Sequence, residues 1–402
     1  MMSGKRILLG VTGSIAAYKA VDILRRLQEQ GAEVRVVMTR NACRFVSKLT
    51  FEALSGFPVL SDEYDPHERE GIGHIDVTSG LDLALIAPAT ANSIGKIASG
   101  IADDALTSAL MAIDCPLMIA PAMNDRMYRN AVLRRNMASL RELSVRFIEP
   151  EVGKLACGTE GQGRLAETST IVDAVSASFL PRDLAGVTVL VTAGPTREPI
   201  DAVRFISNPS TGKMGYALAR VARDRGAKVI LISGPVALTP PGGVTFIPVV
   251  SAADLHRAVM EQIGAAQVVV MAAAVSDFRP VAATDRKIKK EAAPATLALE
   301  RTADILQELG ALPGNRLLVG FAAETDDVLD NASRKLRAKQ LDMIVVNDLL
   351  TNGAGFGSDT NVVTIIDRNG LTTHLPLMDK TEVAARVLDK VLELKAKQGN
   401  LP

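Results

Sequence analysis

Short apolar runs alternate with amphipathic stretches along the first part of the chain. Four of these runs have the length of buried strands: Lys5–Gly10, Glu33–Met38, Leu81–Ala87 and Pro116–Ala120. The stretches between and after them predict helices over Ser14–Gln30, over Gly95–Ala112 with a break near Gly100, and over Ile171–Phe179. Strands that alternate with helices form parallel sheets, so this part is predicted to be a doubly wound α/β domain.

The same pattern begins again in the middle of the chain. Val187–Thr192 is a predicted strand, followed by a Gly194-Pro195 turn, a long polar loop and a helix that starts near Met214. Later strands are predicted at Lys228–Ser233, Val244–Val249, Gln267–Ala272, Leu317–Gly320 and Met343–Asn347, then a hairpin of Val362–Ile366 and Thr372–Leu375 over Asn369-Gly370. The predicted helices are Met214–Arg225, Ala252–Ile263 and Thr381–Lys397. The sequence thus predicts two Rossmann-like domains with parallel sheets, residues 1–180 and 187–402, joined by a linker at Ser178–Gly186.

Composition narrows the function classes. The chain has 402 residues, 48% of them hydrophobic and 22% charged, with a formal net charge of zero, so no nucleic-acid or membrane partner is expected. No secretory signal is recognisable, and no apolar run reaches the roughly 18 residues of a membrane span. Cys43, Cys115 and Cys157 are too few for a disulfide framework. We expect a cytoplasmic protein.

The first loop has the composition of a phosphate site. Gly10–Ser14 places small residues and two hydroxyls at a helix N-terminus, where N–H groups and the helix dipole favour an anion. A tight turn capped by Ser14 is the alternative. The strand ends at Thr39, Pro88 and Pro121 should meet this loop at one edge of the sheet, where open α/β sheets bind ligands.

Two further residues stand in unusual surroundings. His74 lies between a Gly-rich stretch and Asp76, which makes it a candidate acid or base, although a lone histidine is usually a surface group. Cys157 lies in a segment with three glycines, Gly158, Gly161 and Gly163, which predicts a mobile flap rather than packed structure. A chemical role is therefore favoured for this thiol, whereas Cys43 and Cys115 are interpreted as structural.

Several motifs of the first half resemble a known family. GSIAAYK, PATAN, ASGIADD, PAMNDRMY and ACGTEGQGR are similar to the flavin-dependent cysteine decarboxylases, and most closely to the phosphopantothenoylcysteine decarboxylase half of bifunctional coenzyme A biosynthesis enzymes. The resemblance implies that FMN oxidises the cysteinyl thiol to a thioaldehyde, that CO2 then leaves, and that reduced FMN returns the hydride. It implies His74 as base, Asn124 with Met123 at the substrate carboxylate and Cys157 as proton donor. It implies FMN contacts from Gly13, Ser14, Thr39, Pro88, Ala89, Thr90 and Asn92.

The second half contains an incomplete P-loop. Ser210-Thr211-Gly212-Lys213 lacks the glycine required at Ser207 and the hydroxyl required at Met214, so a Rossmann-like anion site on helix N–H groups is expected instead. Asp277 follows a predicted strand and is a candidate Mg²⁺ or ribose ligand, or else a cap. Lys287-Ile288-Lys289-Lys290 is either a solvated face or a clamp for a triphosphate.

Together these motifs resemble the phosphopantothenate–cysteine ligase family. TAGPTREPIDAVRFISN, STGKMG, AAAVSDF, KIKK and GFAAET carry the similarity. The resemblance implies that CTP and 4′-phosphopantothenate form an acyl-cytidylate, which the amine of cysteine attacks to release CMP. It implies Asn208 and Lys287 as catalytic residues and Asp277 as the metal ligand. It implies substrate contacts from Ala273, Asp277, Lys287, Ala303, Asp304, Ile305, Leu306, Phe321, Lys335 and Lys339.

The sequence differs from the usual family motifs at three places, and two alternative functions remain to be considered. Tyr128 stands where many members have Trp, Thr159 where Asp is common, and Ser276 and Phe278 flank Asp277 in place of Ala and Trp. A non-catalytic FMN-binding regulatory protein is one rival, which the trio His74, Asn124 and Cys157 disfavours. An NAD(P) oxidoreductase is the other, disfavoured because the first loop lacks a third glycine. The resemblance also implies a homo-oligomer, a trimer of dimers or a dodecamer.

Overall fold

The computed structural model describes residues 2–62, 73–154, 158, 160–289, 296–324, 328–348, 351, 353–355 and 357–397. The chain divides into two compact units, Met1–Phe179 and Leu180–Pro402. No helix in the described ranges is both long and apolar enough to cross a bilayer.

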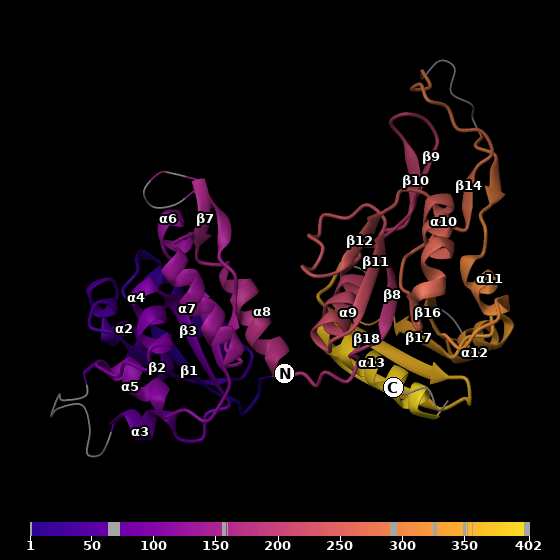
Figure 1. Ribbon diagram of the computed structural model, residues 1–402. Coiled ribbons are helices and arrows are strands. Elements are labelled where there is room, and N and C mark those ends of the chain that lie inside the picture. Colours follow the sequence, from indigo (N-terminus) through magenta and orange to yellow (C-terminus); the bar gives the residue numbers. More distant parts are fainter. Residues whose placement is uncertain are drawn as a thin grey trace. The chain divides into compact units, whose positions relative to one another are not determined.

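The first unit is built on a parallel sheet of five strands. They are β1 (Arg6–Val11), β2 (Glu33–Met38), β3 (Leu83–Ala89), β4 (Leu117–Pro121) and β5 (Arg146–Phe147), in the order β2-β1-β3-β4-β5 (Figure 1). The order changes direction between β1 and β3, which makes this pair the topological switch point where sheets of this kind bind ligands.

Helices cover both faces of this sheet. One core joins the strands to α1 (Lys19–Glu29), α2 (Lys48–Ser55) and α8 (Thr168–Ser178). The opposite core joins them to α3 (Gly73–Thr78), α4 (Ala91–Ala98), α5 (Ala105–Met111) and α7 (Ala131–Glu142). The short segments are η1 (Ile15–Tyr18), η2 (Ala42–Arg44), α6 (Asp125–Tyr128) and the hairpin β6 (Glu151–Lys154) with β7 (Glu160–Arg164).

The second unit contains an eight-stranded sheet. Its strands are β8 (Thr188–Ala193), β11 (Lys228–Ser233), β12 (Thr245–Pro248), β13 (Val268–Met271), β16 (Leu317–Glu324), β17 (Met343–Asp348), β18 (Thr360–Asp367) and β19 (Thr372–Asp379). The order is β12-β11-β8-β13-β16-β17-β18-β19, so the switch point lies between β8 and β13. One core packs α9 (Lys213–Asp224) and α13 (Lys380–Lys397), and the other packs α10 (Ala252–Gln262), α11 (Ile305–Ala311) and α12 (Val328–Ala338), with η3 (Ile263–Ala265) after α10.

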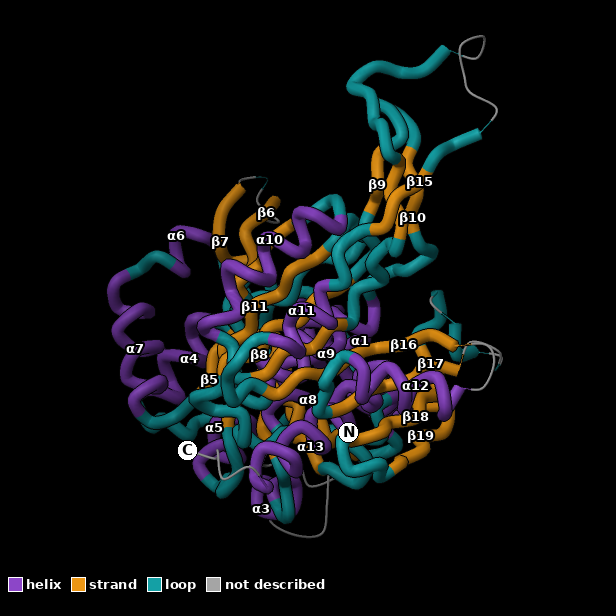
Figure 2. Tube along the Cα trace, turned by 90° about the vertical axis from the view of Figure 1, so that its right-hand side faces the viewer, coloured by secondary structure: helices purple, strands orange, loops and turns teal. Residues whose placement is uncertain are grey.

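Two small hairpins of the second unit lie outside this sheet. β9 (Arg197–Pro199) pairs with β10 (Phe205–Ser207), and β14 (Phe278–Pro280) pairs with β15 (Leu299–Arg301), all antiparallel. Figure 2 shows β9, β10 and β15 side by side, away from the strands of the large sheet. These two hairpins, each with the loop that joins its own two strands, are together called the arm.

The predicted fold class, two doubly wound α/β domains, is confirmed, with four corrections of detail. The second sheet is mixed, because β18 runs antiparallel to both of its neighbours, β17 and β19. The predicted first helix begins as the 3-10 turn η1, and the long polar loop contains the β9–β10 hairpin. The end of the predicted linker is packed, since Leu184 is fully buried and Asp183 is bonded to Arg225.

Candidate functional site

A cleft of about 700 Å³ lies at the carboxyl ends of the strands of the first unit. We call it the switch-point cleft. It brings together the loop after β1, the loop after β2 and the N-terminus of α4, three segments far apart in the sequence. Its lining residues are Gly13, Thr39, Arg40, Asn41, Ser61, Asp62, Thr90, Ala91, Asn92, Ser93, Lys96, Asp103, Asp104, Ala105 and Met127.

Buried hydrogen bonds hold the two strand ends of this cleft together. The Thr12 hydroxyl donates to the carbonyl of Pro88 at 2.8 Å and accepts the N–H of Thr90 at 3.0 Å. Thr90 in turn caps α4 by accepting the N–H of Ser93. Gly13 packs against Asn41 so closely that a Cβ on Gly13 would lie 2.4 Å from the Asn41 Cβ. A residue with a side chain would therefore not fit at position 13.

The predicted FMN residues therefore separate into two groups. Gly13, Thr39, Thr90 and Asn92 line the switch-point cleft. Pro88 and Ala89 instead form the strand end behind it, and Ser14 caps η1 by accepting the N–H of Ala16 at 3.3 Å, as the structural alternative proposed.

The prediction missed a charged cluster on the rim of this cleft. Lys96 Nζ donates to Asp103 at 2.5 Å and to Asp104 at 2.9 Å. The hydrogen bond that Lys96 donates to Asp103 raises the pKa of Lys96, so its ammonium group stays charged. Asp103 and Asp104 end the ASGIADD motif, but nothing in the sequence pattern gave their distance from Lys96.

The turn that carries Asn124 is clamped to the β6–β7 hairpin. Gly163 accepts the N–H of Met123 at 2.9 Å, and Asp125 accepts the N–H of Gln162 at 3.3 Å. A Cβ on Gly161 would lie 2.6 Å from Asp125, and one on Gly163 would lie 2.3 Å from the carbonyl oxygen of Met123. The prediction of a flap that lacks packing is thus wrong at these two glycines, which are needed for close packing.

Two predicted catalytic side chains fall outside the described residues. Cys157 lies between β6 and β7, in a segment that the structure does not describe. His74 lies in the first turn of α3, and its side chain is outside the description. Asn124 is described, and it caps α6 by accepting the N–H of Arg126 at 2.9 Å.

Tyr128, where relatives of the motif have Trp, is fully buried behind this turn. Its hydroxyl donates to Glu149, and the guanidinium of Arg134 lies 4.3 Å from the ring centre. Burial and the bond to Glu149 raise the pKa of Tyr128 to about 12, so the hydroxyl remains a donor. The residue therefore supports the Asn124 turn from the core.

In the second unit, a cleft of about 820 Å³ contains most of the predicted substrate residues. We call it the Asn208 cleft. It lies where β13 and β16 end against α11 and α12. The predicted residues that line it are Asn208, Ala273, Asp277, Ala303, Asp304, Ile305, Leu306, Phe321, Lys335 and Lys339.

The polar groups of this cleft are already oriented. Asn208 Nδ2 donates to the carbonyl oxygens of Ala274 at 3.0 Å and Val275 at 3.2 Å, so both amide protons are used and Oδ1 remains as an acceptor. Lys339 Nζ lies 2.9 Å from Asp304, which caps α11.

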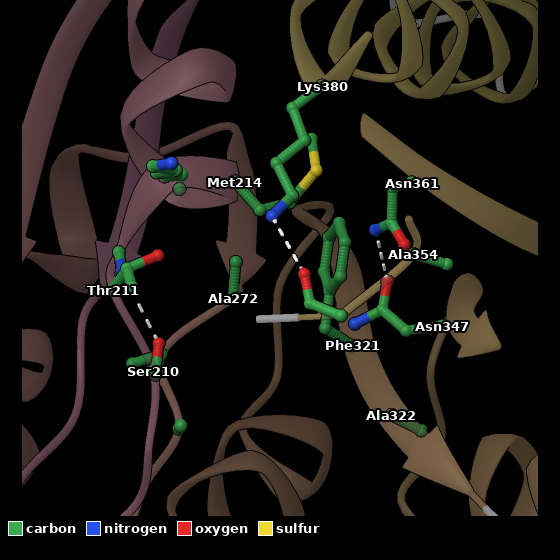
Figure 3. A pocket seen from close by; sticks show the side chains of 16 residues that line it. Ser210, Thr211, Met214, Ala272, Phe321, Ala322, Asn347, Ala354, Asn361 and Lys380 are labelled. Atoms are coloured by element: carbon green, nitrogen blue, oxygen red, sulfur yellow. Dashed lines mark hydrogen bonds between the residues drawn. The ribbon is translucent and has the colours of Figure 1, made fainter. Parts of the chain in front are cut away.

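A second, smaller cavity of about 120 Å³ adjoins the Asn208 cleft across Ala273, Ala274 and Phe321. We call it the Lys380 cavity. Its described lining includes Lys213 and Lys380 and no carboxylate. Figure 3 shows Lys380, Asn347 and Asn361 around it, with the Ser210–Thr211 turn on the opposite side.

The donors of the Lys380 cavity are fixed by their neighbours. Lys380 is 6% exposed and donates to the carbonyl of Ser358 at 2.5 Å, while burial and the charge of Lys213 lower its pKa. Asn361 Oδ1 accepts the N–H of Val362, so its amide nitrogen donates to Asn347 Oδ1 at 2.9 Å. Asn347 is therefore left with its NH2 group as a donor. This arrangement suits an anion.

Lys287 is not brought into either cavity. It lies exposed on the arm, next to Ile288, whose backbone is bonded to Asp201 and Arg204. Of the predicted ligase residues, it is the one that the structure separates from the rest.

Two family models match the chain. The model described as Flavoprotein covers residues 1–180, and the one described as DNA/pantothenate metabolism flavoprotein C-terminal domain covers residues 184–394. Among curated proteins, the chain is 49% identical over 403 residues to the coenzyme A biosynthesis bifunctional protein CoaBC of Bacillus subtilis (strain 168), with 99% of each chain covered. It is 40% identical over 396 residues to the CoaBC protein of Escherichia coli (strain K12), with 97% of each covered.

Solved structures match each half separately. The crystal structure of the C-terminal domain of a CoaBC protein has 44% identity and a TM-score of 0.47, and covers 54% of this chain and 99% of that one. The structure of a mutant PPC decarboxylase complexed with pantothenoylaminoethenethiol has 35% identity and a TM-score of 0.40, and covers 44% of this chain and 98% of that one.

Proposed function

The chain belongs to the family of bifunctional coenzyme A biosynthesis proteins, and on this premise we propose how its two clefts divide the reactions. It is a bifunctional enzyme with a flavoprotein decarboxylase domain and a ligase domain, as the motifs predicted. We assign the decarboxylase to residues 1–180 and the ligase to residues 187–402. The observation that carries this proposal is that each unit has a cleft at the carboxyl ends of its sheet strands, lined by residues of the matching motif set.

The switch-point cleft fits the FMN that flavoproteins of this family bind. Its volume of about 700 Å³ lies in the range of cofactor pockets. The N-terminus of α4 and the hydroxyls of Thr39 and Thr90 supply donors for a phosphate and for the polar edge of a flavin ring. We infer that Gly13, Thr39, Thr90 and Asn92 hold FMN, with Pro88, Ala89 and Ser14 shaping the backbone behind them. When bound, FMN supplies the two-electron oxidation and reduction that let CO2 leave.

The Asn124 turn and the β6–β7 hairpin form the substrate side of the decarboxylase in this proposal. Asn124, beside Met123, binds the carboxylate that is lost, and His74 acts as the base for the cysteinyl thiol. Cys157 donates the proton that completes the product. Two hydrogen bonds between β7 and the turn support this assignment, because they hold the strand that follows Cys157 against the Asn124 turn.

In the ligase, the Asn208 cleft takes the nucleotide and the Lys380 cavity takes a phosphate group of the substrates. Lys335 and Lys339 contact CTP, as do Ala273, Asp277, Phe321 and the segment Ala303–Leu306. Asn208 Oδ1 accepts an N–H of the incoming cysteine amine, since its own protons are used elsewhere. Lys287 neutralises charge on the transferring phosphate, and the preference for CTP follows from the family.

Mg²⁺ is proposed as the second cofactor. The described residues contain no group of three His, Cys, Asp or Glu side chains that could hold a metal alone. Magnesium usually keeps several waters and binds one or two carboxylates together with substrate phosphates. We therefore assign it to Asp277 and the phosphates of CTP.

The enzyme is further proposed to act in the cytoplasm as a homo-oligomer, a trimer of dimers or a dodecamer, on 4′-phosphopantothenate, cysteine and CTP, without nucleic acid or membrane partners. The ligase acts first and supplies the substrate of the decarboxylase.

A coupled assay tests this proposal. Purified protein is incubated with 4′-phosphopantothenate, cysteine, CTP and Mg²⁺, and CMP and CO2 are measured together with flavin absorbance. We expect equal amounts of CMP and CO2 and one FMN per chain. Protein that releases neither product, or that takes up no FMN, would reject it.

A further inference from the structure

The arm contains a bonded junction between two loops that lie far apart in the sequence. One loop is the turn of the β9–β10 hairpin, which includes Asp201 and Arg204. The other is the segment 281–289 after β14, which carries Lys287. Figure 2 shows the two loops above the strands of the arm.

Asp201 is the centre of this junction. Its side chain is 0% exposed although the arm is a surface element. One carboxylate oxygen, Oδ1, accepts the N–H groups of Val203 and Arg204, each at 2.8 Å. The other, Oδ2, accepts Arg204 Nε at 3.0 Å and the N–H of Ile288 at 3.1 Å. The hydrogen bond from Arg204 holds the pKa of Asp201 well below its usual range, so it is charged at neutral pH.

The segment that carries Lys287 is fixed at both backbone groups of one residue. The N–H of Ile288 donates to Asp201, and its carbonyl accepts Arg204 Nη2 at 3.0 Å. A third bond, from the N–H of Thr284 to the carbonyl of Ile200 at 3.3 Å, ties the start of the segment to the same turn. The backbone on both sides of Lys287 is therefore held, while its side chain is exposed.

We propose that Asp201 is a positioning residue of the ligase, which acts through the backbone of Ile288 to place Lys287 for the transfer of the nucleotidyl group. The proposal rests on the function assigned above to Lys287. A lysine on an unanchored loop would have to be ordered during each turnover, and that entropy would add to the activation barrier. The buried carboxylate of Asp201 instead fixes the backbone beside Lys287 before the substrates bind.

Asp201→Asn tests this, because it keeps the size of the side chain and removes its charge. We expect kcat for CMP release to fall about 10- to 100-fold, as misplaced groups near a reaction commonly cost, with little change in the KM for CTP. CO2 release from supplied phosphopantothenoylcysteine should be unchanged, because it occurs in the other unit. Asp254→Asn is the matched control, since Asp254 also pairs with an arginine, Arg257, but lies on α10 without contact to the segment 281–289.

A double-mutant cycle separates positioning from a general structural role. If Asp201 acts through Lys287, then Asp201→Asn should cause no further loss of kcat in a Lys287→Ala background. If the fold-losses of kcat in the two single variants multiplied in the double variant, the proposal would be overturned. An Asp201→Asn enzyme with wild-type kcat would also overturn it, and so would a Lys287→Ala enzyme with an unchanged rate of CMP release. Asp201→Glu, which restores the charge, should recover part of the rate and guards against misfolding of the Asn variant. Wild-type protein without any CMP release would instead refute the proposed function.

Discussion

Gly163→Ala should separate the β6–β7 hairpin from the Asn124 turn. The new Cβ would lie 2.3 Å from the carbonyl oxygen of Met123, closer than any real contact, and Gly163 has a φ of +151°, which L side chains rarely adopt. The hairpin must therefore shift, and it loses the bond between the N–H of Met123 and the carbonyl of Gly163.

The size of the effect follows from these two terms. A lost backbone hydrogen bond costs about 0.5–1.5 kcal/mol, and backbone strain costs about 1–3 kcal/mol. Their sum, about 1.5–4.5 kcal/mol, corresponds to a roughly 10- to 2,000-fold weaker docking of the hairpin. Because Cys157 lies between the two strands of the hairpin, decarboxylation should slow by at least about tenfold.

The assay is CO2 release from supplied phosphopantothenoylcysteine, with CMP release as an internal control in the other unit. Gly95→Ala is the matched variant: it lies in α4, and its new Cβ would approach only Asn136, at 3.7 Å. It should leave the rate unchanged and, as a helix substitution, add up to about 1 kcal/mol of stability. A Gly163→Ala enzyme with the wild-type rate of CO2 release would refute the reasoning.

Three further predictions concern charged groups of the second unit. Arg225→Met should destabilise this unit by about 2–3 kcal/mol in urea unfolding, because buried Arg225 bonds Asp183 and Asp389, which remain partly hydrated when it is removed; an unchanged midpoint would contradict this. Lys395→Met should raise the melting temperature, because Lys395 is 7% exposed, has no hydrogen bond or ion pair to another described residue, and its pKa is lowered by burial; a lower melting temperature would argue against it. CTP should bind more weakly as the pH rises above about 8, where phosphates no longer titrate, because a bound anion raises the lowered pKa of Lys380 and binding therefore takes up a proton. The Lys380→Met protein should bind CTP weakly at all pH values, and its affinity should change less with pH. An equal change of CTP affinity with pH in both proteins would count against the assignment.

The sequence predicted the order and type of most elements because both sheets are built from buried strands. β2 and β11, for example, begin and end at the predicted residues. It also predicted the hairpin that β18 forms with β19, but it could not give the antiparallel pairing of β18 with β17 or the arm. Those features depend on long-range pairing and on short strands of three residues, such as β9 and β14, which have no periodicity of their own.

Some residues of the two clefts were predicted from the sequence and others were missed, for physical reasons. Residues at the ends of parallel strands, such as Thr39 and Ala273, necessarily approach the switch points, so their motifs were sufficient. Lys380 was missed because it begins a helix that appeared only amphipathic, and nothing local places it beside Lys213. Glycines in the Cys157 segment suggested freedom, whereas two of them permit contact with the Asn124 turn.

The most direct test of two separate sites uses cysteine labelled at the carboxyl carbon. Asn208→Ala protein given phosphopantothenate, labelled cysteine and CTP should release neither CMP nor labelled CO2, yet should decarboxylate supplied labelled phosphopantothenoylcysteine at the wild-type rate. Cys157→Ser protein should form CMP normally and release no labelled CO2 from either mixture. If either substitution abolished both reactions or left both intact, the division of labour between the two clefts would be contradicted.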